Sequence, residues 1–203
     1  MKITPLVQKA ITKINEIHQG ESRKAEQFPY VVHPYAVAIL LSRYTDDENT
    51  IVAGLLHDVL EDVDPAVYSQ ADICRDFSQL ICQIVQEVSV LETAHRRSNF
   101  KLTWRERKLK YLDQLTVASP EALMICAADK IHFIQSITTS YLEEGESLWY
   151  KLNPSVTPQE RFWFCQKVLA ILRSRLNNPI VDKLARTLEA ATASIRIGAG
   201  AAQ

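Results

Sequence analysis

The stretch Ile51 to Asp64, which reads IVAGLLHDVLEDVD, decides the fold of this chain. Its apolar first half is typical of a buried helix, while its second half carries a histidine and several acids, among them His57, Asp58, Glu61 and Asp62. The intervals of four residues place these side chains in two pairs on neighbouring faces of one helix. A buried carboxylate without a positive partner is costly, so the pattern favours a bound metal ion.

The composition is that of an ordinary globular protein. The 203 residues are enough for one domain with a full core. Hydrophobic residues make up 47% and charged residues 23% of the sequence, and the formal net charge is -1. This charge gives no overall attraction to nucleic acid or to a membrane surface, so an anionic ligand must be bound by a local basic cluster.

The sequence carries no signal for export or membrane insertion. It begins Met-Lys-Ile-Thr-Pro, and no uninterrupted apolar segment approaches the roughly 20 residues that a membrane-spanning helix needs. Four cysteines are scattered along the chain without the spacing of a zinc or thioredoxin motif: Cys74, Cys82, Cys126 and Cys165. We therefore expect a cytoplasmic protein whose thiols are reduced.

Helical spacing of apolar residues recurs along the whole chain and predicts an all-α fold. Only five glycines occur, and strand-like alternation is hard to find. Besides the central helix, which ends at Asp64-Pro65, the pattern predicts helices over residues 5–18, 34–44, 69–77, 80–92, 104–115, 120–139, 158–177 and 180–195. Residues 93–101 should form a polar loop. We expect one domain over residues 1–195 and a frayed tail over residues 196–203.

Two further residues extend the candidate metal site. His33 stands just before the predicted helix 34–44, and Asp129 interrupts an apolar run that is too hydrophobic to face water. Each has an ordinary explanation alone, as a capping histidine or a solvated aspartate. Together with His57 and Asp58 they form a set of two imidazoles and two carboxylates, which suits Mn²⁺, Fe²⁺ or Zn²⁺ better than Ca²⁺. Such an ion activates water for hydrolysis.

The order of these residues resembles the H...HD...D pattern of the HD-domain metal-dependent phosphohydrolases. The chain is most similar to the hydrolase domain of RelA/SpoT proteins and to the small single-domain alarmone hydrolases, over about residues 5–190. Five pieces in the family's order carry the resemblance: Arg23-Lys24, Pro29-Tyr30-x-x-His33-Pro34, Gly54-Leu-Leu-His57-Asp58, Glu61-Asp62-x-Asp64 and Ala128-Asp129-Lys130.

This resemblance implies an HD-domain helical bundle and a function. The expected activity is Mn²⁺-dependent hydrolysis of the 3'-pyrophosphate of guanosine tetraphosphate or pentaphosphate, with release of pyrophosphate. The acids that match Glu61 and Asp62 serve the attacking water in that family, and the basic pair that matches Arg23 and Lys24 helps to hold the nucleotide. The residues agree with this reading, because the two acids stand one turn beyond His57 and Asp58. A solvated helix end is the alternative.

Four other residues are candidates for substrate binding. Tyr30 could stack on the base or simply pack beside Pro29, and Lys130 could reach a phosphate or pair with an acid. Arg107 and Lys108 belong to a basic segment that resembles the family's Trp-x-x-Arg-Lys pattern and could form the far wall of an anion pocket. The alternative for this segment is a solvated helix face.

The chain departs from the family pattern in two places. Phe133 occupies the position where the family commonly has an asparagine that contacts the nucleotide sugar, and the loop from Arg23 to His33 is shorter and lacks the usual glycine. The departure at Phe133 leaves the substrate open. Another phosphorylated nucleotide, such as NADPH or a different 3'-phosphorylated nucleotide, and a nucleotide-sensing module with weak catalysis are the alternatives. With 203 residues we expect a hydrolase without a synthetase domain.

Overall fold

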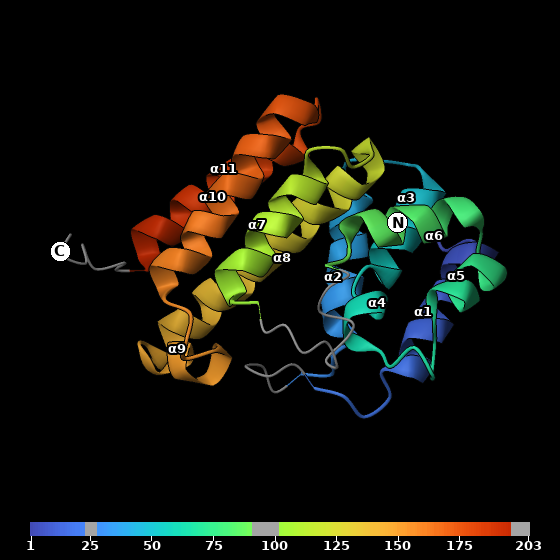
Figure 1. Ribbon diagram of the computed structural model, residues 1–203, viewed down its shortest axis with the longest axis horizontal. Coiled ribbons are helices and arrows are strands. Elements are labelled where there is room, and N and C mark those ends of the chain that lie inside the picture. The colour runs from blue at the N-terminus through green and yellow to red at the C-terminus, as the bar shows by residue number, and fades with distance from the viewer. Residues whose placement is uncertain (23–27, 91–101, 196–203) are drawn as a thin grey trace.

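The computed structural model describes residues 1–22, 28–90 and 102–195. Within these residues the chain is all-α, as predicted, and the one β-type contact is an isolated bridge between Ser22 and Pro29. The helices, shown in Figure 1, are α1 Pro5–Ile17, α2 Val32–Leu41, α3 Glu48–Leu56, α4 Val59–Asp62, α5 Gln70–Asp76, α6 Gln79–Val88, α7 Trp104–Leu115, α8 Pro120–Glu144, α9 Ser147–Leu152, α10 Pro158–Arg175 and α11 Ile180–Ser194.

Side-chain caps fix where most of these helices begin. A polar residue before the helix accepts a hydrogen bond from a backbone amide of the first turn in α1, α3, α5, α6, α7, α8 and α10. In α5, α7 and α10 the third helical residue returns a hydrogen bond and completes a capping box. Such caps satisfy amides that have no partner inside the helix. They explain why the predicted start of α7 is confirmed at Trp104.

The long helix α8 forms the centre of the molecule. It packs against α2, α3 and α6 from the first half of the chain and against α10 and α11 from the second half (Figure 1). Its first turns are buried without interruption from Ala122 to Ala128. Asp129 follows directly, so the first acid after this buried run lies at the meeting point of the two halves.

The prediction of one continuous helix through His57 and Asp58 is wrong. Helix α3 ends at Leu56 and α4 begins at Val59. The carbonyl of His57 accepts a hydrogen bond from the Ser89 hydroxyl at 3.1 Å, whereas in an α-helix it would accept the amide of Glu61. That amide instead donates to the carbonyl of Asp58 at 3.0 Å. The contact with Ser89 therefore accompanies a break in the helix at His57 and Asp58.

Other helix boundaries also differ from the predictions. Helix α8 continues to Glu144, five residues beyond the expected end, and α6 ends at Val88. Helix α9 was not predicted, because six residues are too few to show a helical period. In α9, Trp149 is buried, whereas Tyr150 is exposed. The predicted loop 93–101 and tail 196–203 lie outside the described residues.

The prediction that all four cysteines are reduced is wrong for one pair. Cys74 and Cys82 form a disulfide that links α5 to α6. These two helices pack against each other after a short connection, and the two Cα atoms lie 5.0 Å apart, a distance that a disulfide spans. The eight-residue separation alone did not reveal this pairing. Cys126 and Cys165 are free and buried.

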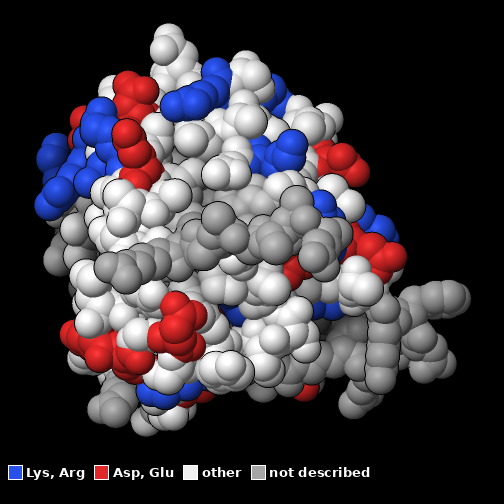
Figure 2. Space-filling view, turned by 90° about the vertical axis from the view of Figure 1, so that its left-hand side faces the viewer, with Lys and Arg blue, Asp and Glu red and all other residues white. Residues whose placement is uncertain are grey.

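Among the described residues, no helix is long and apolar enough to cross a membrane. On the face in Figure 2, Lys and Arg side chains lie beside Asp and Glu side chains over much of the upper surface. The absence of a nucleic-acid partner stays a prediction.

Candidate functional site

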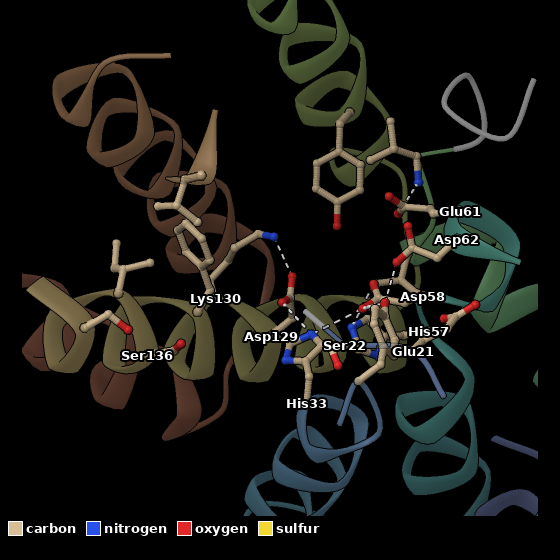
Figure 3. Close-up of a pocket in the computed structure, with 18 of the residues that line it drawn as sticks. Glu21, Ser22, His33, His57, Asp58, Glu61, Asp62, Asp129, Lys130 and Ser136 are labelled. Atoms are coloured by element: carbon tan, nitrogen blue, oxygen red, sulfur yellow. Dashed lines mark hydrogen bonds and ion pairs between the residues drawn. The ribbon is translucent and has the colours of Figure 1, made fainter. Parts of the chain in front are cut away.

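A pocket of about 740 Å³ lies beside α8 and contains most of the predicted site residues. Its polar end holds the histidines and acids around the α3–α4 break, and Ser136 lies farther along α8 (Figure 3). The lining residues are Glu21, Ser22, Tyr30, His33, His57, Asp58, Glu61, Asp62, Val88, Val90, Lys108, Tyr111, Asp129, Lys130, Phe133, Ser136, Ile137, Ser140, Leu148 and Leu152.

Three side chains at the polar end could hold a metal ion. His33 comes from the first turn of α2, and His57 and Asp58 come from the α3–α4 break. Their ligand atoms all lie within 4.8 Å of one another. The Nδ1–H of His57 donates to the carbonyl of Gly54 at 2.9 Å, which turns Nε2 into the pocket. The Nε2 atoms of both histidines are buried and make no hydrogen bond within the described structure.

Asp129 joins this group from the opposite side of the pocket. Its Oδ1 lies 3.4 Å from Nε2 of His33, and Asp58 Oδ2 lies 3.3 Å from the same nitrogen. Asp58 Oδ1 is 3.1 Å from Nε2 of His57. The structure thus brings together all four predicted metal ligands. Two buried imidazole nitrogens without hydrogen bonds, facing carboxylate oxygens, form a nitrogen and oxygen donor set that fits a divalent transition ion.

The charges of these groups favour binding of a cation. Burial acts to raise the pKa of Asp58 and Asp129, but interactions with neighbouring groups outweigh it. For Asp58 these are His57 and His33, and for Asp129 they are Lys130 and the histidines, so both carboxyl pKa values fall below their usual range. Burial lowers the pKa of His57, yet the nearby carboxylates, first of all Asp58, raise it to about 9. Both carboxylates are therefore ionised at neutral pH.

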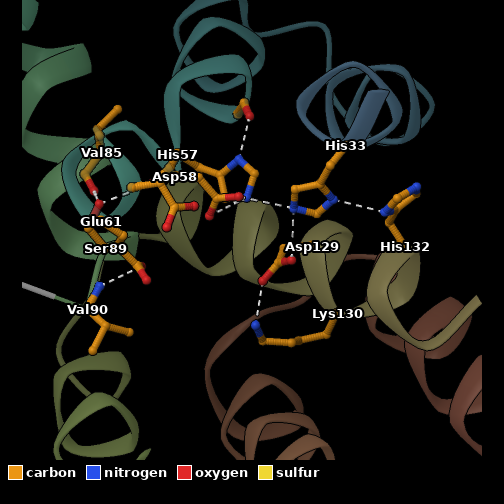
Figure 4. Close-up of polar contacts among 12 residues, drawn as sticks. His33, His57, Asp58, Glu61, Val85, Ser89, Val90, Asp129, Lys130 and His132 are labelled. Atoms are coloured by element: carbon orange, nitrogen blue, oxygen red, sulfur yellow. Dashed lines mark hydrogen bonds and ion pairs between the residues drawn. The ribbon is translucent and has the colours of Figure 1, made fainter. Parts of the chain in front are cut away.

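Glu61 and Asp62 project from α4 beside this group. Oε1 of Glu61 accepts a hydrogen bond from the Val90 amide at 2.7 Å (Figure 4). Burial and repulsion by Asp58 raise the pKa of Glu61 to about 7, and the same two causes raise the pKa of Asp62. Sequence reasoning placed both acids near the candidate ligands, but it did not identify the backbone amide that fixes Glu61.

The raised pKa of Glu61 predicts that Glu61→Gln stabilises the metal-free protein at neutral pH. The pKa is 4.5 in the unfolded chain and about 7 in the folded protein, so the folded state binds this proton more tightly. Wild-type stability therefore falls as pH rises between these values. Because glutamine does not titrate, the difference in unfolding free energy between the variant and the wild type should grow by ~3 kcal/mol from below pH 4.5 to about pH 8. Urea unfolding with EDTA measures it, and a difference independent of pH contradicts the prediction.

Tyr30 lies at the edge of the same acidic cluster. Its hydroxyl donates to Asp58 Oδ2 at 3.0 Å and also contacts Oδ2 of Asp62. One face of its ring stacks on His18, with the ring centroids 4.3 Å apart. Burial, and then the charges of the two aspartates, raise the pKa of Tyr30, which keeps the phenol protonated. The contacts in the structure thus tie this residue to the acids.

The predicted basic residues differ in position. Lys130 and Lys108 line the pocket, Arg107 does not, and two others lie outside the described residues. Lys130 and Lys108 line the pocket from α8 and α7, and their Nζ atoms lie 5.5 Å and 4.7 Å from the ring centre of Phe164. Burial, with repulsion by Lys130, lowers the pKa of Lys108 to about 8, whereas Asp129, its ion-pair partner, raises the pKa of Lys130 despite burial. Arg107 is not among the lining residues and donates to the carbonyl of Leu102 at 2.6 Å.

Two predicted residues cannot be placed. Arg23 and Lys24 lie outside the described residues. The residues next to them in sequence, Glu21 and Ser22, line the pocket.

The far part of the pocket was missed from the sequence, apart from Phe133. Phe133 lines the pocket one turn beyond Asp129, as its spacing predicts. Ser136 and Ser140 continue along the same face of α8 at helical spacing, a signal that the sequence did contain. Leu148 and Leu152 come from α9, which only the tertiary structure places against the pocket.

Comparisons with known proteins agree with this geometry. The family model described as HD domain matches residues 10–152. Over 140 residues the chain is 28% identical to a GTP pyrophosphokinase of Streptomyces coelicolor, which covers 69% of this chain and 16% of that protein. Over 128 residues it is 30% identical to the bifunctional (p)ppGpp synthase/hydrolase SpoT of Escherichia coli, which covers 60% of this chain and 16% of that protein.

A solved structure extends the similarity to nearly the whole chain. It belongs to a metazoan ortholog of SpoT that hydrolyses ppGpp, and it superposes with a TM-score of 0.72 and 26% identity. The match covers 95% of this chain and 98% of that one, whereas the chain spans only 16% of the two bacterial relatives. Because the family model matches more than half of the residues and includes His33, His57, Asp58 and Asp129, the chain belongs to the HD domain family.

Proposed function

We propose that this protein is a metal-dependent phosphohydrolase that cleaves the 3'-pyrophosphate of guanosine tetraphosphate or pentaphosphate. The observation that carries the proposal is the convergence of two buried imidazole nitrogens, without hydrogen bonds, on the carboxylates of Asp58 and Asp129 in a pocket that also contains Glu61. The bacterial relatives include a kinase and a synthase/hydrolase, but the match covers 16% of each. The metazoan protein, matched over 98% of its length, hydrolyses ppGpp and supports the hydrolytic reading.

The candidate ligands of the metal are His33, His57, Asp58 and Asp129. Their mixed nitrogen and oxygen donors suit Mn²⁺, with Fe²⁺ or Zn²⁺ as alternatives. When bound, such an ion would polarise a phosphoryl oxygen and lower the pKa of water at the site. The protein's own contribution is to hold the four side chains in place, through the Gly54 carbonyl behind His57 and the helix break that separates Asp58 from α3.

Glu61 and Asp62 have different roles toward the attacking water. The Val90 amide holds Glu61 through one carboxylate oxygen, so the other oxygen can accept a proton from water. A pKa of about 7 is suited to a general base at neutral pH. Asp62 is tied to the hydroxyl of Tyr30 and is better placed to orient the water or the substrate. We assign Glu61 as the general base. We propose that Tyr30 positions Asp62 and does not stack on the nucleobase of the substrate.

Positive charge for the phosphates comes from Lys130 and Lys108. Both ammonium groups lie at the pocket and near the ring of Phe164, which leaves them partly desolvated and strengthens their attraction for an anion. Arg23 and Lys24 are proposed as further phosphate ligands on the basis of the sequence pattern. Arg107 is assigned no role in substrate binding, because its guanidinium group donates to a backbone carbonyl and does not line the pocket.

Phe133 favours a second candidate substrate. The pocket beyond the lysines is bounded by Phe133, Ile137 and Leu148, where the family pattern would supply an asparagine for the sugar. A phosphorylated nucleotide that needs less polar recognition of its sugar would suit this wall. Another 3'-phosphorylated nucleotide, or NADPH with its 2'-phosphate, is therefore the alternative within the same chemistry.

A nucleotide panel tests the substrate. With Mn²⁺ present, guanosine tetraphosphate should release pyrophosphate, and Phe133→Asn should raise kcat/KM for it by about tenfold, the effect of one restored hydrogen bond. Phosphate and pyrophosphate are assayed separately. If guanosine tetraphosphate survives while NADPH or another 3'-phosphorylated nucleotide is cleaved, the alarmone assignment fails and the hydrolytic mechanism stands. Phe133→Leu serves as the matched control, since it reduces bulk without adding a polar group.

The proposed function also bears on the extent of the domain and on the cellular location of the protein. We propose that residues 1–195 act as one catalytic domain, which the packing of α8 against helices from both halves of the chain supports. We also propose a cytoplasmic location, where nucleotide substrates occur.

A further inference from the structure

We propose that His132 is a positioning residue that holds the imidazole of His33 with its proton on Nδ1, so that Nε2 is the atom presented to the metal. This rests on the proposed function, because it concerns a candidate ligand of the metal. His33 is buried, with 1% of its surface exposed, and its Nδ1 lies 2.9 Å from Nδ1 of His132 (Figure 4). The ring centroids are 4.9 Å apart.

Two side chains of α8 contact the two nitrogens of the His33 ring. Asp129 and His132 are three residues apart, so they lie on the same face of α8. Oδ1 of Asp129 is 3.4 Å from Nε2 of His33, while His132 contacts Nδ1 on the other side of the ring. The ring of His33, which comes from α2, is therefore oriented by two side chains of a different helix.

The hydrogen bond between the two imidazoles can have only one donor. If His132 donated, Nδ1 of His33 would be the acceptor, and a neutral His33 would carry its proton on Nε2 and could not bind a cation there. The carboxylate oxygens lie 3.3 Å and 3.4 Å from that Nε2, longer than charge-assisted hydrogen bonds, and Nε2 makes no hydrogen bond in the described structure. Donation by His33 leaves Nε2 unprotonated, and His132 then presents a bare Nδ1.

His57 shows the same arrangement with a different acceptor. Its Nδ1 contacts the Gly54 carbonyl, which can only accept, so Nδ1 must carry the proton and Nε2 faces the pocket. In both histidines Nδ1 would thus donate to an acceptor and Nε2 would face the candidate metal site. In one the acceptor is a backbone carbonyl, which no substitution removes, and in the other it is the side chain of His132, which can be replaced.

Two substitutions at His132 test the proposal by titration with Mn²⁺. His132→Asn keeps an acceptor, because the amide oxygen stands close to the place of the imidazole Nδ1, whereas His132→Leu has similar volume and no acceptor. We expect the Leu variant to bind Mn²⁺ about 10–100-fold more weakly than the wild type and the Asn variant within about threefold of it. Wild-type affinity in the Leu variant overturns the proposal, and so does an equal loss in both variants, since that indicates packing alone.

A second measurement needs neither a variant nor a metal. In metal-free protein labelled with ¹⁵N, the one-bond coupling to hydrogen should be found on Nδ1 of His33 and not on Nδ1 of His132. A proton on Nδ1 of His132 overturns the proposal even if the wild type binds Mn²⁺. If the wild type binds no metal but this tautomer is present, the proposed function fails and the assignment of His132 as acceptor stands.

Discussion

Asp129→Asn should remove the metal from this protein and reduce hydrolysis to background. Wild-type protein purified without a chelator should contain about one transition ion per chain, because one set of four nitrogen and oxygen donors converges in the pocket. Asparagine matches the shape of aspartate but has no negative charge, so it leaves the two histidines with Asp58 alone. We expect metal content near zero after dialysis and a fall in kcat/KM of about 10³-fold or more, equivalent to ~4 kcal/mol. His57→Ala should have the same effect.

The control for this experiment is Asp182→Asn. Asp182 is an exposed acid in the first turn of α11, and it is not among the residues that line the pocket. This variant should retain its metal and its activity. Metal content is measured by elemental analysis of dialysed protein. A wild type that folds fully and hydrolyses nucleotides without any metal would contradict the metal-dependent mechanism, and so would an Asp129→Asn protein that keeps its ion.

The sequence predicted the composition of the site better than its shape. Four candidate ligands scattered over about half of the chain were predicted because a known pattern contains them. In the structure the ligand atoms of His33, His57 and Asp58 lie within 4.8 Å of one another, and Oδ1 of Asp129 lies 3.4 Å from Nε2 of His33. The pattern did not contain the break between α3 and α4, because that break involves the hydroxyl of Ser89, 32 residues away in sequence. The same segment supplies the Val90 amide that holds Glu61. Long-range backbone contacts of this kind leave no periodic signal.

Spacing along a helix also did not show which of two neighbouring basic residues lines the pocket. Arg107 and Lys108 are neighbours in sequence, but consecutive positions on a helix point in different directions, and only Lys108 lines the pocket. The ring of Tyr30 is stacked on His18, and no pattern in the sequence connects these two residues. His132 contacts His33, which lies 99 residues earlier in the sequence and on another helix. Spacing predicts the face of a helix, and only the fold supplies the partner.

Glu61→Gln should lower kcat by about 10²–10⁴-fold while Mn²⁺ binding is retained, because it removes the proposed general base and none of the candidate ligands. Glutamine keeps an oxygen that can accept from the Val90 amide, so the position of the side chain is preserved. The pocket should therefore still bind the nucleotide, and KM should change little. Single-turnover hydrolysis with saturating Mn²⁺ measures the chemical step separately from product release.

Comparison with Asp62→Asn and Tyr30→Phe decides which acid is the base. If Asp62 only orients water or substrate, its asparagine variant keeps a hydrogen-bonding oxygen and should lose about tenfold in kcat. Tyr30→Phe should lose a similar amount, because it removes the hydroxyl that holds Asp62 and leaves the acid itself in place. In a double variant the loss should be smaller than the sum of the two, since Tyr30 acts in part by holding Asp62 and in part through its hydrogen bond to Asp58. A larger loss for Asp62→Asn than for Glu61→Gln would reverse the assignment and make Asp62 the base.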